Sequence, residues 1–209
     1  MATVIQQFLK QAEKQPDHVA VLDSQGAITY DRMNNLSAYM AEQILDRIGG
    51  KDRRGRIALL LPRTKAFVVA QFAVLRAGCA VVPIDAEYPA DRVQMILEDV
   101  GCVLCVTTEA LAEKAAGFPV LKIESIQPAD GHDPVGDKTL DLSDSDAEGY
   151  ILYTSGSTGK PKGVVHRQEL LNFPVEALHD IIKPSGRSRT LNIAGFSFIA
   201  GLVDRKSVV

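Results

Sequence analysis

The residues best suited to chemistry lie in one short segment, Thr154 to Gly163, which combines three glycines, four hydroxyl side chains and two lysines. Glycines let backbone N–H groups approach an anion closely, and hydroxyls donate further hydrogen bonds. Lysine adds a compact positive charge that suits phosphate oxygens. Because the segment follows Tyr150 to Thr154, an apolar run typical of a buried strand, we predict a phosphate-binding loop rather than a flexible surface loop.

The P-loop of kinases and ATPases is the main alternative for such a loop. That motif requires a glycine, four further residues, and then Gly-Lys followed by Ser or Thr. Gly159-Lys160 would supply its end, but Thr154 stands where the first glycine is required, and Pro161 follows Lys160. The sequence therefore disfavours a conventional P-loop NTPase at two positions.

The elements that must position this loop alternate between strands and helices. Apolar runs suited to buried strands alternate with helical periodicity from Arg56 to Ile123, which is typical of a parallel sheet covered by helices. We therefore predict an α/β fold of three layers, with mostly parallel sheets flanked by helices. The expected helices span 4–14, 31–48, 64–76, 90–100, 109–116 and 168–182, and the expected strands span 19–23, 27–30, 56–61, 79–84, 102–107, 120–123, 150–154 and 190–194.

Composition and charge exclude several classes of protein. The 209 residues are 46% hydrophobic and 23% charged, which excludes a disordered or collagen-like chain. A net charge of −3 gives no field that would attract nucleic acid or an anionic membrane, and no apolar run is long enough to span a bilayer. From Tyr150 onward eight bases and four acids give +4, which agrees with a segment facing polyphosphate and equally with solvated lysines. Seven acids between Asp130 and Glu148 indicate a solvated acidic loop.

The three cysteines indicate a reducing, cytoplasmic setting, because no cleavable apolar segment precedes them. Cys102 and Cys105 form a C-x-x-C motif on an expected strand. Strand alternation would place these two thiols on opposite faces, and no second ligand pair for zinc follows at a suitable spacing. We therefore interpret both as core residues rather than as a redox or metal site.

Three segments carry a resemblance to a known family. Tyr150-Ile-Leu-Tyr-Thr-Ser-Gly-Ser-Thr-Gly-Lys-Pro-Lys-Gly163 resembles the AMP-binding signature of the acyl-adenylate-forming superfamily. Leu75-Arg-Ala-Gly-Cys-Ala-Val-Val-Pro-Ile-Asp85, with its continuation to Arg92, resembles the second block of amino-acid adenylation domains of nonribosomal peptide synthetases, and Thr29 to Leu36 resembles the first. The resemblance covers nearly the whole chain in the expected order.

This resemblance implies an enzyme that joins a carboxylic acid, either an amino acid or a related acid, to ATP and releases pyrophosphate. The acyl-adenylate then passes to a phosphopantetheine thiol on a carrier protein or on CoA. The loop would bind the β- and γ-phosphates and help to organise Mg²⁺, on which Thr158 would act indirectly. His166 is expected to be structural, because an ionised acid needs no general base. The residues implied in ATP binding are Thr154, Ser155, Gly156, Ser157, Thr158, Gly159 and Lys162.

The last part of the sequence bears on the acid and on the extent of the domain. Phe198 and Ile199 are implied to line the acid pocket, where amino-acid-activating relatives usually carry an aspartate that binds the α-amino group. Ile199 in its place admits an aryl, hydroxy or fatty acid.

The family continues with an adenine-binding block and a small domain that carries a catalytic lysine. We therefore expect residues 1–203 to be the incomplete N-terminal part of the large domain, inactive alone. We expect residues 204–209, which match a translated sequencing adapter, to be a non-native tail.

Two further hypotheses stay open. One is a shortened protein that binds a nucleotide or a partner without turnover. The other is an acyl-CoA or aryl-acid ligase of the same superfamily. Acid-dependent exchange of pyrophosphate into ATP separates the catalytic hypotheses from the non-catalytic one.

Overall fold

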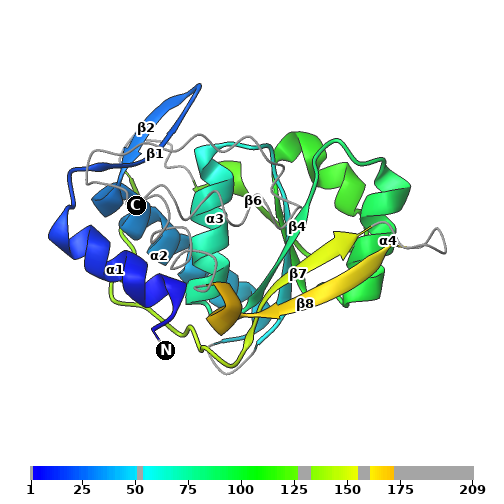
Figure 1. Cartoon of the computed structure of the whole chain (residues 1–209). Helices are drawn as coiled ribbons and strands as arrows, with labels where there is room; N and C mark the ends of the chain where they lie inside the picture. The colour runs from blue at the N-terminus through cyan, green and yellow to red at the C-terminus, as the bar shows by residue number, and fades with distance from the viewer. Residues whose placement is uncertain (1, 51–53, 127–132, 155–160, 172–209) are drawn as a thin grey trace.

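The computed structural model describes residues 2–50, 54–126, 133–154 and 161–171, and its main sheet lies between two layers of helices (Figure 1). Six strands form this sheet in the order β6-β5-β3-β4-β7-β8, and every neighbouring pair is parallel except β7 and β8. The predicted α/β fold with a mostly parallel sheet is confirmed. The helices are α1 (Val4–Lys14), α2 (Tyr30–Ile48), α3 (Lys65–Arg76) and α4 (Ala90–Val100), with 3₁₀ helices η1 (Glu109–Ala115), η2 (Ile123–Ile126) and η3 (Gln168–Leu171). The strands are β1 (Val19–Asp23), β2 (Gly26–Thr29), β3 (Arg56–Leu60), β4 (Ala80–Ile84), β5 (Leu104–Thr107), β6 (Val120–Lys122), β7 (Glu148–Thr154) and β8 (Lys162–Arg167).

The helices nearest the N-terminus form where the sequence predicts them, because their ends carry capping signals. The Thr3 hydroxyl accepts a hydrogen bond from the Gln6 backbone N–H at 3.2 Å, and the Gln6 side chain accepts one from the Thr3 N–H at 3.1 Å. This reciprocal pair is a capping box that starts α1. Gly49, at φ 96°, ends α2 in the left-handed conformation that glycine adopts without strain.

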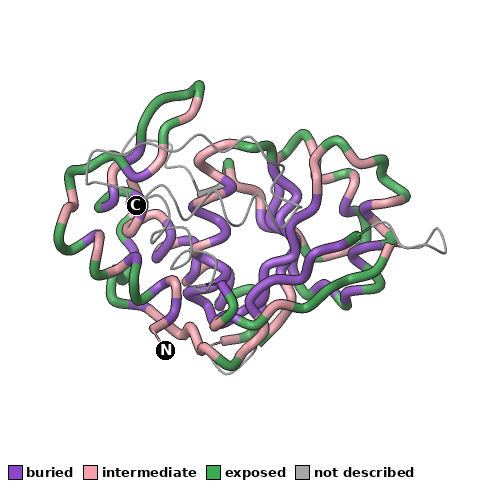
Figure 2. The backbone as a smooth tube through the Cα atoms, in the orientation of Figure 1, coloured by how far each residue is buried: buried purple, intermediate pink, exposed green. Residues whose placement is uncertain are grey.

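Two apolar cores lie on opposite faces of the main sheet. The larger core fills the space under α1, α2 and α3 and includes Ile44, Leu59 and Leu75. The smaller core lies under α4 and includes Ile96 and Leu97. Figure 2 shows the buried central strands in purple between these layers. Strands β3 and β4 are buried on both faces, which explains why they are continuous apolar runs rather than alternating ones.

The chain must cross the helical layer between β6, at one edge of the sheet, and β7, near the other edge. Residues 133–147 are the described part of this crossover, which the sequence predicted as a solvated acidic loop. That interpretation is wrong for the backbone: Leu140 is buried, the Gly136 N–H donates to Asn35 Oδ1 at 3.1 Å, and the Leu142 N–H donates to the Arg76 carbonyl at 2.8 Å. Charge content did not reveal this anchoring, because these contacts use main-chain groups of the crossover, while its charged side chains Asp133 and Lys138 form more exposed ion pairs with α2.

The guanidinium of Arg76, on α3, fastens the crossover to the helices. Arg76 is fully buried, yet no described carboxylate bonds to it. Its donors reach the carbonyls of Leu140 at 2.9 Å and Lys138 at 2.8 Å on the crossover. On α2 they reach the Asn34 carbonyl at 3.0 Å, Asn34 Oδ1 at 2.6 Å and Ser37 Oγ at 3.0 Å. Burial lowers the pKa of Arg76 to about 10, so the group stays charged at neutral pH.

Gly78 allows the crossover to pass close to the turn that follows α3. Its φ of +71° is unfavourable for other residues, and an added Cβ would lie 2.8 Å from the Leu142 carbonyl oxygen. The segment Leu75-Arg-Ala-Gly78 therefore supplies two features. The buried Arg76 side chain, which we call the Arg76 clamp, binds the crossover, and Gly78 lets the crossover backbone approach closely. This segment lies in the stretch that resembles the second block of adenylation domains, and the sequence alone gave it no physical role.

Two elements differ from the sequence-based expectation. The segment 162–167 forms β8, whereas from the sequence we expected the loop to run to Gly163 and assigned no element to 164–167. Val164 and Val165 on this strand are 44% and 47% exposed. Because most residues of β8 are exposed, the segment lacks the alternating pattern that identifies a half-buried strand. The segment 109–115 is a 3₁₀ helix. Of the helix expected over 168–182 only η3 is described, and the strand expected over 190–194 lies outside the described residues.

The Arg76 clamp predicts a large difference between two arginine substitutions. Arg76→Met keeps the aliphatic stem but leaves several buried acceptors without donors, so we expect it to lower the free energy of unfolding by about 3 kcal/mol or more. Arg32→Met is the control: Arg32 also bonds to the crossover, at Asp133, but its side chain is 53% exposed and its loss should cost less than about 1 kcal/mol. Urea unfolding followed by circular dichroism measures both. Equal losses would refute the clamp.

Candidate nucleotide-binding site

The two ends of the predicted phosphate-binding loop meet at the end of the β7–β8 hairpin. Thr154, the last residue of β7, pairs with Lys162, the first residue of β8. The Thr154 hydroxyl donates to the Lys162 carbonyl at 3.5 Å, and both residues are exposed. The structure therefore brings together these two predicted site residues, at the carboxyl end of β7. Ligands of open α/β sheets bind at the carboxyl ends of the parallel strands.

The remaining predicted site residues lie outside the described part of the chain. They are Ser155, Gly156, Ser157, Thr158 and Gly159 of the loop, and Phe198 and Ile199 of the implied acid pocket. The geometry available for the site is therefore that of the two strands from which the loop leaves and to which it returns.

Tyr153 is a residue of this region that the sequence analysis did not single out. Its side chain is buried against the smaller core, and its hydroxyl donates to Asp99 Oδ2 on α4 at 2.6 Å. The relevant signal was the alternation along β7, which places Tyr153 and Ile151 in the smaller core and Leu152 in the larger one. No sequence spacing connects Tyr153 to Asp99, because they belong to different elements.

The turn after β4 is held by side chains from two later elements. The Arg92 guanidinium lies 3.9 Å from the centre of the Tyr88 ring, a cation–π contact. Lys114 Nζ donates to the carbonyls of Ala86 at 2.7 Å and Tyr88 at 2.9 Å. The continuation of the second sequence block therefore shapes a turn at the carboxyl end of β4.

The C-x-x-C motif is structural, although its predicted geometry is wrong. β5 begins at Leu104, so Cys102 lies before the strand and alternation does not apply to it. Both thiols lie in the smaller core, and Cys102 Sγ donates to the Leu104 carbonyl at 3.1 Å. The cysteines are free and buried, and burial raises the pKa of both thiols. These conditions suppress the thiolate that redox chemistry and metal binding require.

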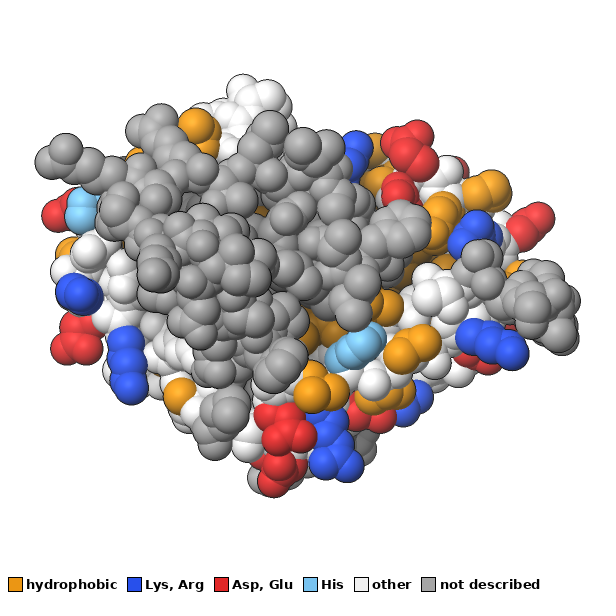
Figure 3. All heavy atoms as spheres, in the orientation of Figure 1, with side chains coloured by type: hydrophobic (Ala, Val, Ile, Leu, Met, Phe, Trp, Pro, Cys, Tyr) orange, Lys and Arg blue, Asp and Glu red, His pale blue; other side chains and the backbone are white. Residues whose placement is uncertain are grey.

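His166 pairs with Tyr150 across the hairpin, four residues beyond Lys162 along β8. Within the described sheet this strand is the last one, and its apolar side chains Val164 and Val165 reach the surface, on the face that Figure 3 shows. Within the described ranges no cluster of three or more His, Cys, Asp or Glu side chains is suited to hold a metal ion. Nor does any described helix have the length and apolar content needed to cross a bilayer.

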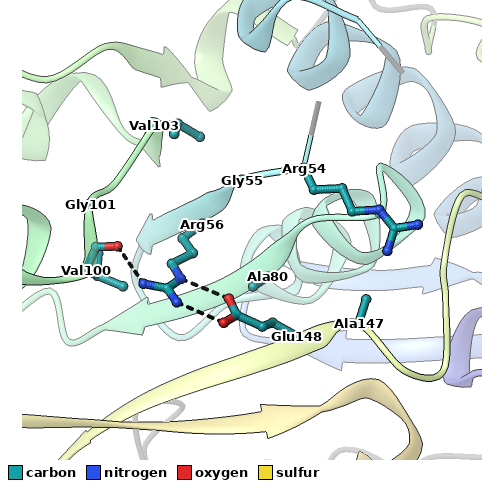
Figure 4. Close-up of a pocket in the computed structure, with 10 residues that line it drawn as sticks. Arg54, Gly55, Arg56, Ala80, Val100, Gly101, Val103, Ala147 and Glu148 are labelled. Atoms are coloured by element: carbon teal, nitrogen blue, oxygen red, sulfur yellow. Dashed lines mark hydrogen bonds and ion pairs between the residues drawn. The ribbon is translucent and has the colours of Figure 1, made fainter. Parts of the chain in front are cut away.

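A cavity of about 500 Å³ opens at the amino-terminal ends of the parallel strands, away from Thr154 (Figure 4). Arg56, on β3, points across it and forms a bidentate pair with Glu148, on β7, with both N–O distances at 2.8 Å. A third donor, Arg56 Nη1, reaches the Val100 carbonyl at 3.3 Å. Arg56 and Glu148, two of the charged residues that line this cavity, therefore satisfy one another, and we assign the cavity no ligand.

Comparison with known proteins identifies the family. A family model described as "AMP-binding enzyme" matches residues 8–205, nearly the whole chain. The chain belongs to the family of AMP-binding enzymes. Its relatives include bacitracin synthase 2 of Bacillus licheniformis, 31% identical over 199 residues, and gramicidin S synthase 2 of Brevibacillus brevis, 35% identical over 197 residues. These matches cover 95% and 91% of this chain but only 7% and 4% of the respective relatives.

Solved structures agree with this assignment. The nonribosomal peptide synthetase FmoA3 (S1046A) matches with a TM-score of 0.83 and 26% identity, over 98% of this chain and 21% of that one. The N-terminal subdomain of NpsA from Klebsiella oxytoca has the same fold, with a TM-score of 0.82 at 22% identity, over all of this chain and 52% of that one. The resemblance to adenylation domains of nonribosomal peptide synthetases is thus confirmed, and this AMP-binding enzyme chain spans a small part of its curated relatives.

The Arg56–Glu148 pair predicts how stability of this AMP-binding enzyme chain depends on pH. Hydrogen bonds from Arg56 lower the pKa of Glu148, so its contribution is present above the ordinary glutamate pKa and is lost as the pH falls through the lowered value. We expect the free energy of unfolding to fall more steeply below about pH 5 in the parent chain than in Glu148→Gln. At pH 7 the substitution should cost less than about 1 kcal/mol, because both side chains are 40–41% exposed. Parallel pH profiles would contradict this role.

Proposed function

We propose that the intact protein activates a carboxylic acid with ATP, forms an acyl-adenylate and releases pyrophosphate. The observation that carries the proposal is the loop of glycines, hydroxyls and lysines whose two ends, Thr154 and Lys162, meet at the carboxyl end of β7. The membership of this chain in the family of AMP-binding enzymes supports the proposal, and so does the AMPPNP-bound form of the similar FmoA3 structure.

In this proposal the loop acts by positioning and by electrostatic stabilisation. The hydroxyls of Ser155, Ser157 and Thr158 donate to phosphate oxygens, and that of Thr154 does so when it turns away from the Lys162 carbonyl. Gly156 and Gly159 permit close backbone approach. Lys162 places positive charge where pyrophosphate departs. The carboxylate of the acid attacks the α-phosphate itself, so the protein supplies orientation rather than a nucleophile.

Mg²⁺ and phosphopantetheine complete the proposal. Hydroxyl and phosphate oxygens are ligands that suit Mg²⁺, which keeps most of its contacts to phosphate and water. We therefore expect Thr158 to act on the metal indirectly and the phosphates of ATP to carry it. The acyl acceptor would be a phosphopantetheine thiol on a carrier protein or CoA, and we expect the protein to work in the cytoplasm with no nucleic-acid or membrane partner.

Pyrophosphate exchange tests the reaction directly. A complete adenylation domain that contains this sequence should exchange labelled pyrophosphate into ATP only when its acid is present. Lys162→Ala should lower that rate about 100-fold, and Thr158→Ala about 10-fold, because each removes a group that contacts the departing phosphates. The 209-residue chain alone should show no exchange.

Lys138→Ala is the matched control for the lysine substitution. Lys138 is an exposed lysine on the crossover and pairs with Asp31, so loss of its side chain should leave the exchange rate unchanged. An intact domain that binds MgATP but exchanges no pyrophosphate with any acid would support the non-catalytic hypothesis instead. Exchange by the 209-residue chain would overturn the expected inactivity.

The class of acid forms a separate proposal, which rests on Ile199. An aliphatic side chain offers no charge to an α-ammonium group, so we propose an aryl, hydroxy or fatty acid rather than an α-amino acid. In a substrate panel, acids without an α-amino group should give about 10-fold more exchange than their α-amino counterparts, and Ile199→Asp should reverse the order. Stronger exchange with an α-amino acid in the parent domain would refute this assignment.

A further inference from the structure

Tyr153 links the strand before the phosphate-binding loop to the helical layer. It is the last buried residue of β7, 8% exposed, and its neighbour Thr154 begins the loop. The hydroxyl donates to Asp99 Oδ2 at 2.6 Å, which is short for a hydrogen bond between two oxygen atoms. Burial first, and then Asp99, raise the pKa of Tyr153, so the hydroxyl keeps its proton at neutral pH and remains a donor.

The strand after the loop leaves space for this ring. Gly163 pairs with Tyr153 across the hairpin, and a Cβ added to it would lie 3.1 Å from Tyr153 Cζ and 3.3 Å from Tyr153 Oη. Another residue there would press on the ring and on Ile151 Cγ2, at 3.2 Å. Gly163 thus permits this close packing, and a larger residue would need the ring or Ile151 to shift by a few tenths of an ångström.

Asp99 is itself held in place. It lies in the last turn of α4, and the next residue, Val100, accepts a hydrogen bond from Arg56 Nη1 at 3.3 Å. Figure 1 shows that the carboxyl end of β7 and the amino end of β8 lie beside α4. The Tyr153 hydroxyl therefore links the end of β7, where the loop begins, to α4, and Arg56 links the last turn of α4 to the sheet.

We propose that Tyr153, held by Asp99 and seated over Gly163, is a positioning residue that sets the direction in which Thr154 and Lys162 face the phosphates of ATP. This inference rests on the proposed function. It assigns a role in ATP binding to a side chain that contacts no phosphate. Loss of the hydroxyl should therefore weaken the interaction with ATP selectively and leave the acid site unchanged.

Kinetic constants for the two substrates of the complete adenylation domain test this assignment. Tyr153→Phe removes only the hydroxyl and should raise the KM for ATP about 10-fold, with the KM for the acid changed less than about 2-fold. Asp99→Ala should reproduce this effect, and the double variant should add nothing, because both changes break one interaction. Asp99→Asn keeps an acceptor oxygen and should restore most of the affinity for ATP. Gly163→Ala should also raise the KM for ATP.

Tyr150→Phe is the matched control, because Tyr150 lies on the same strand but faces the larger core. It should leave the KM for ATP unchanged. If Tyr153→Phe lowers the melting temperature without changing the KM for ATP, or raises both KM values equally, Tyr153 is structural only and the inference is overturned. Absence of acid-dependent exchange in the parent domain overturns the proposed function and this inference together.

Discussion

The buried guanidinium of Arg76 is the interaction on which the placement of the site depends. The chain leaves the sheet at one edge, after β6, and must return on the other side of β4 as β7. An arginine side chain can fasten this crossing because its five donors suit carbonyl oxygens of different segments at once. In this chain they join α2, α3 and the crossover. The charge is buried without a bonded carboxylate among the described residues, so the hydrogen bonds and nearby acids must offset its desolvation.

Placement of β7 decides where the loop begins. Parallel pairing of β7 with β4 aligns their carboxyl ends, and the antiparallel return of β8 brings Lys162 opposite Thr154. The turn after β4, held by Lys114 and the Tyr88–Arg92 contact, lies at the carboxyl end of the adjacent strand. Each of the three sequence blocks therefore has its own structural role. The block from Leu75 to Arg92 supplies the Arg76 clamp and this turn, and the block from Tyr150 to Gly163 supplies the loop. In the block from Thr29 to Leu36, Thr29 caps α2.

Much of the fold could be predicted from the sequence because its signals are local. Helix α1 has the predicted bounds, since Thr3 and Gln6 cap it and apolar spacing marks its buried face. Strands β3 and β4 were recognisable as continuous apolar runs. Strand β8, the last of the described sheet, was missed because most of its residues are exposed, so burial imposed no pattern on it. Cys102 and Cys105 were expected on opposite faces because Cys102 was taken as part of the strand, and the start of β5 depends on its pairing with β3.

The sequence by itself determined the alternation of strands and helices, the family, and the chemistry of the loop, because these follow from residue types within short segments. Only the tertiary structure decided that Arg76 clamps the crossover, that Tyr153 bonds to Asp99, and that Thr154 lies opposite Lys162. The first two contacts join residues 54 or more positions apart. Such pairs are set by the packing of whole elements against one another, and no local periodicity specifies which distant partner a polar group will meet.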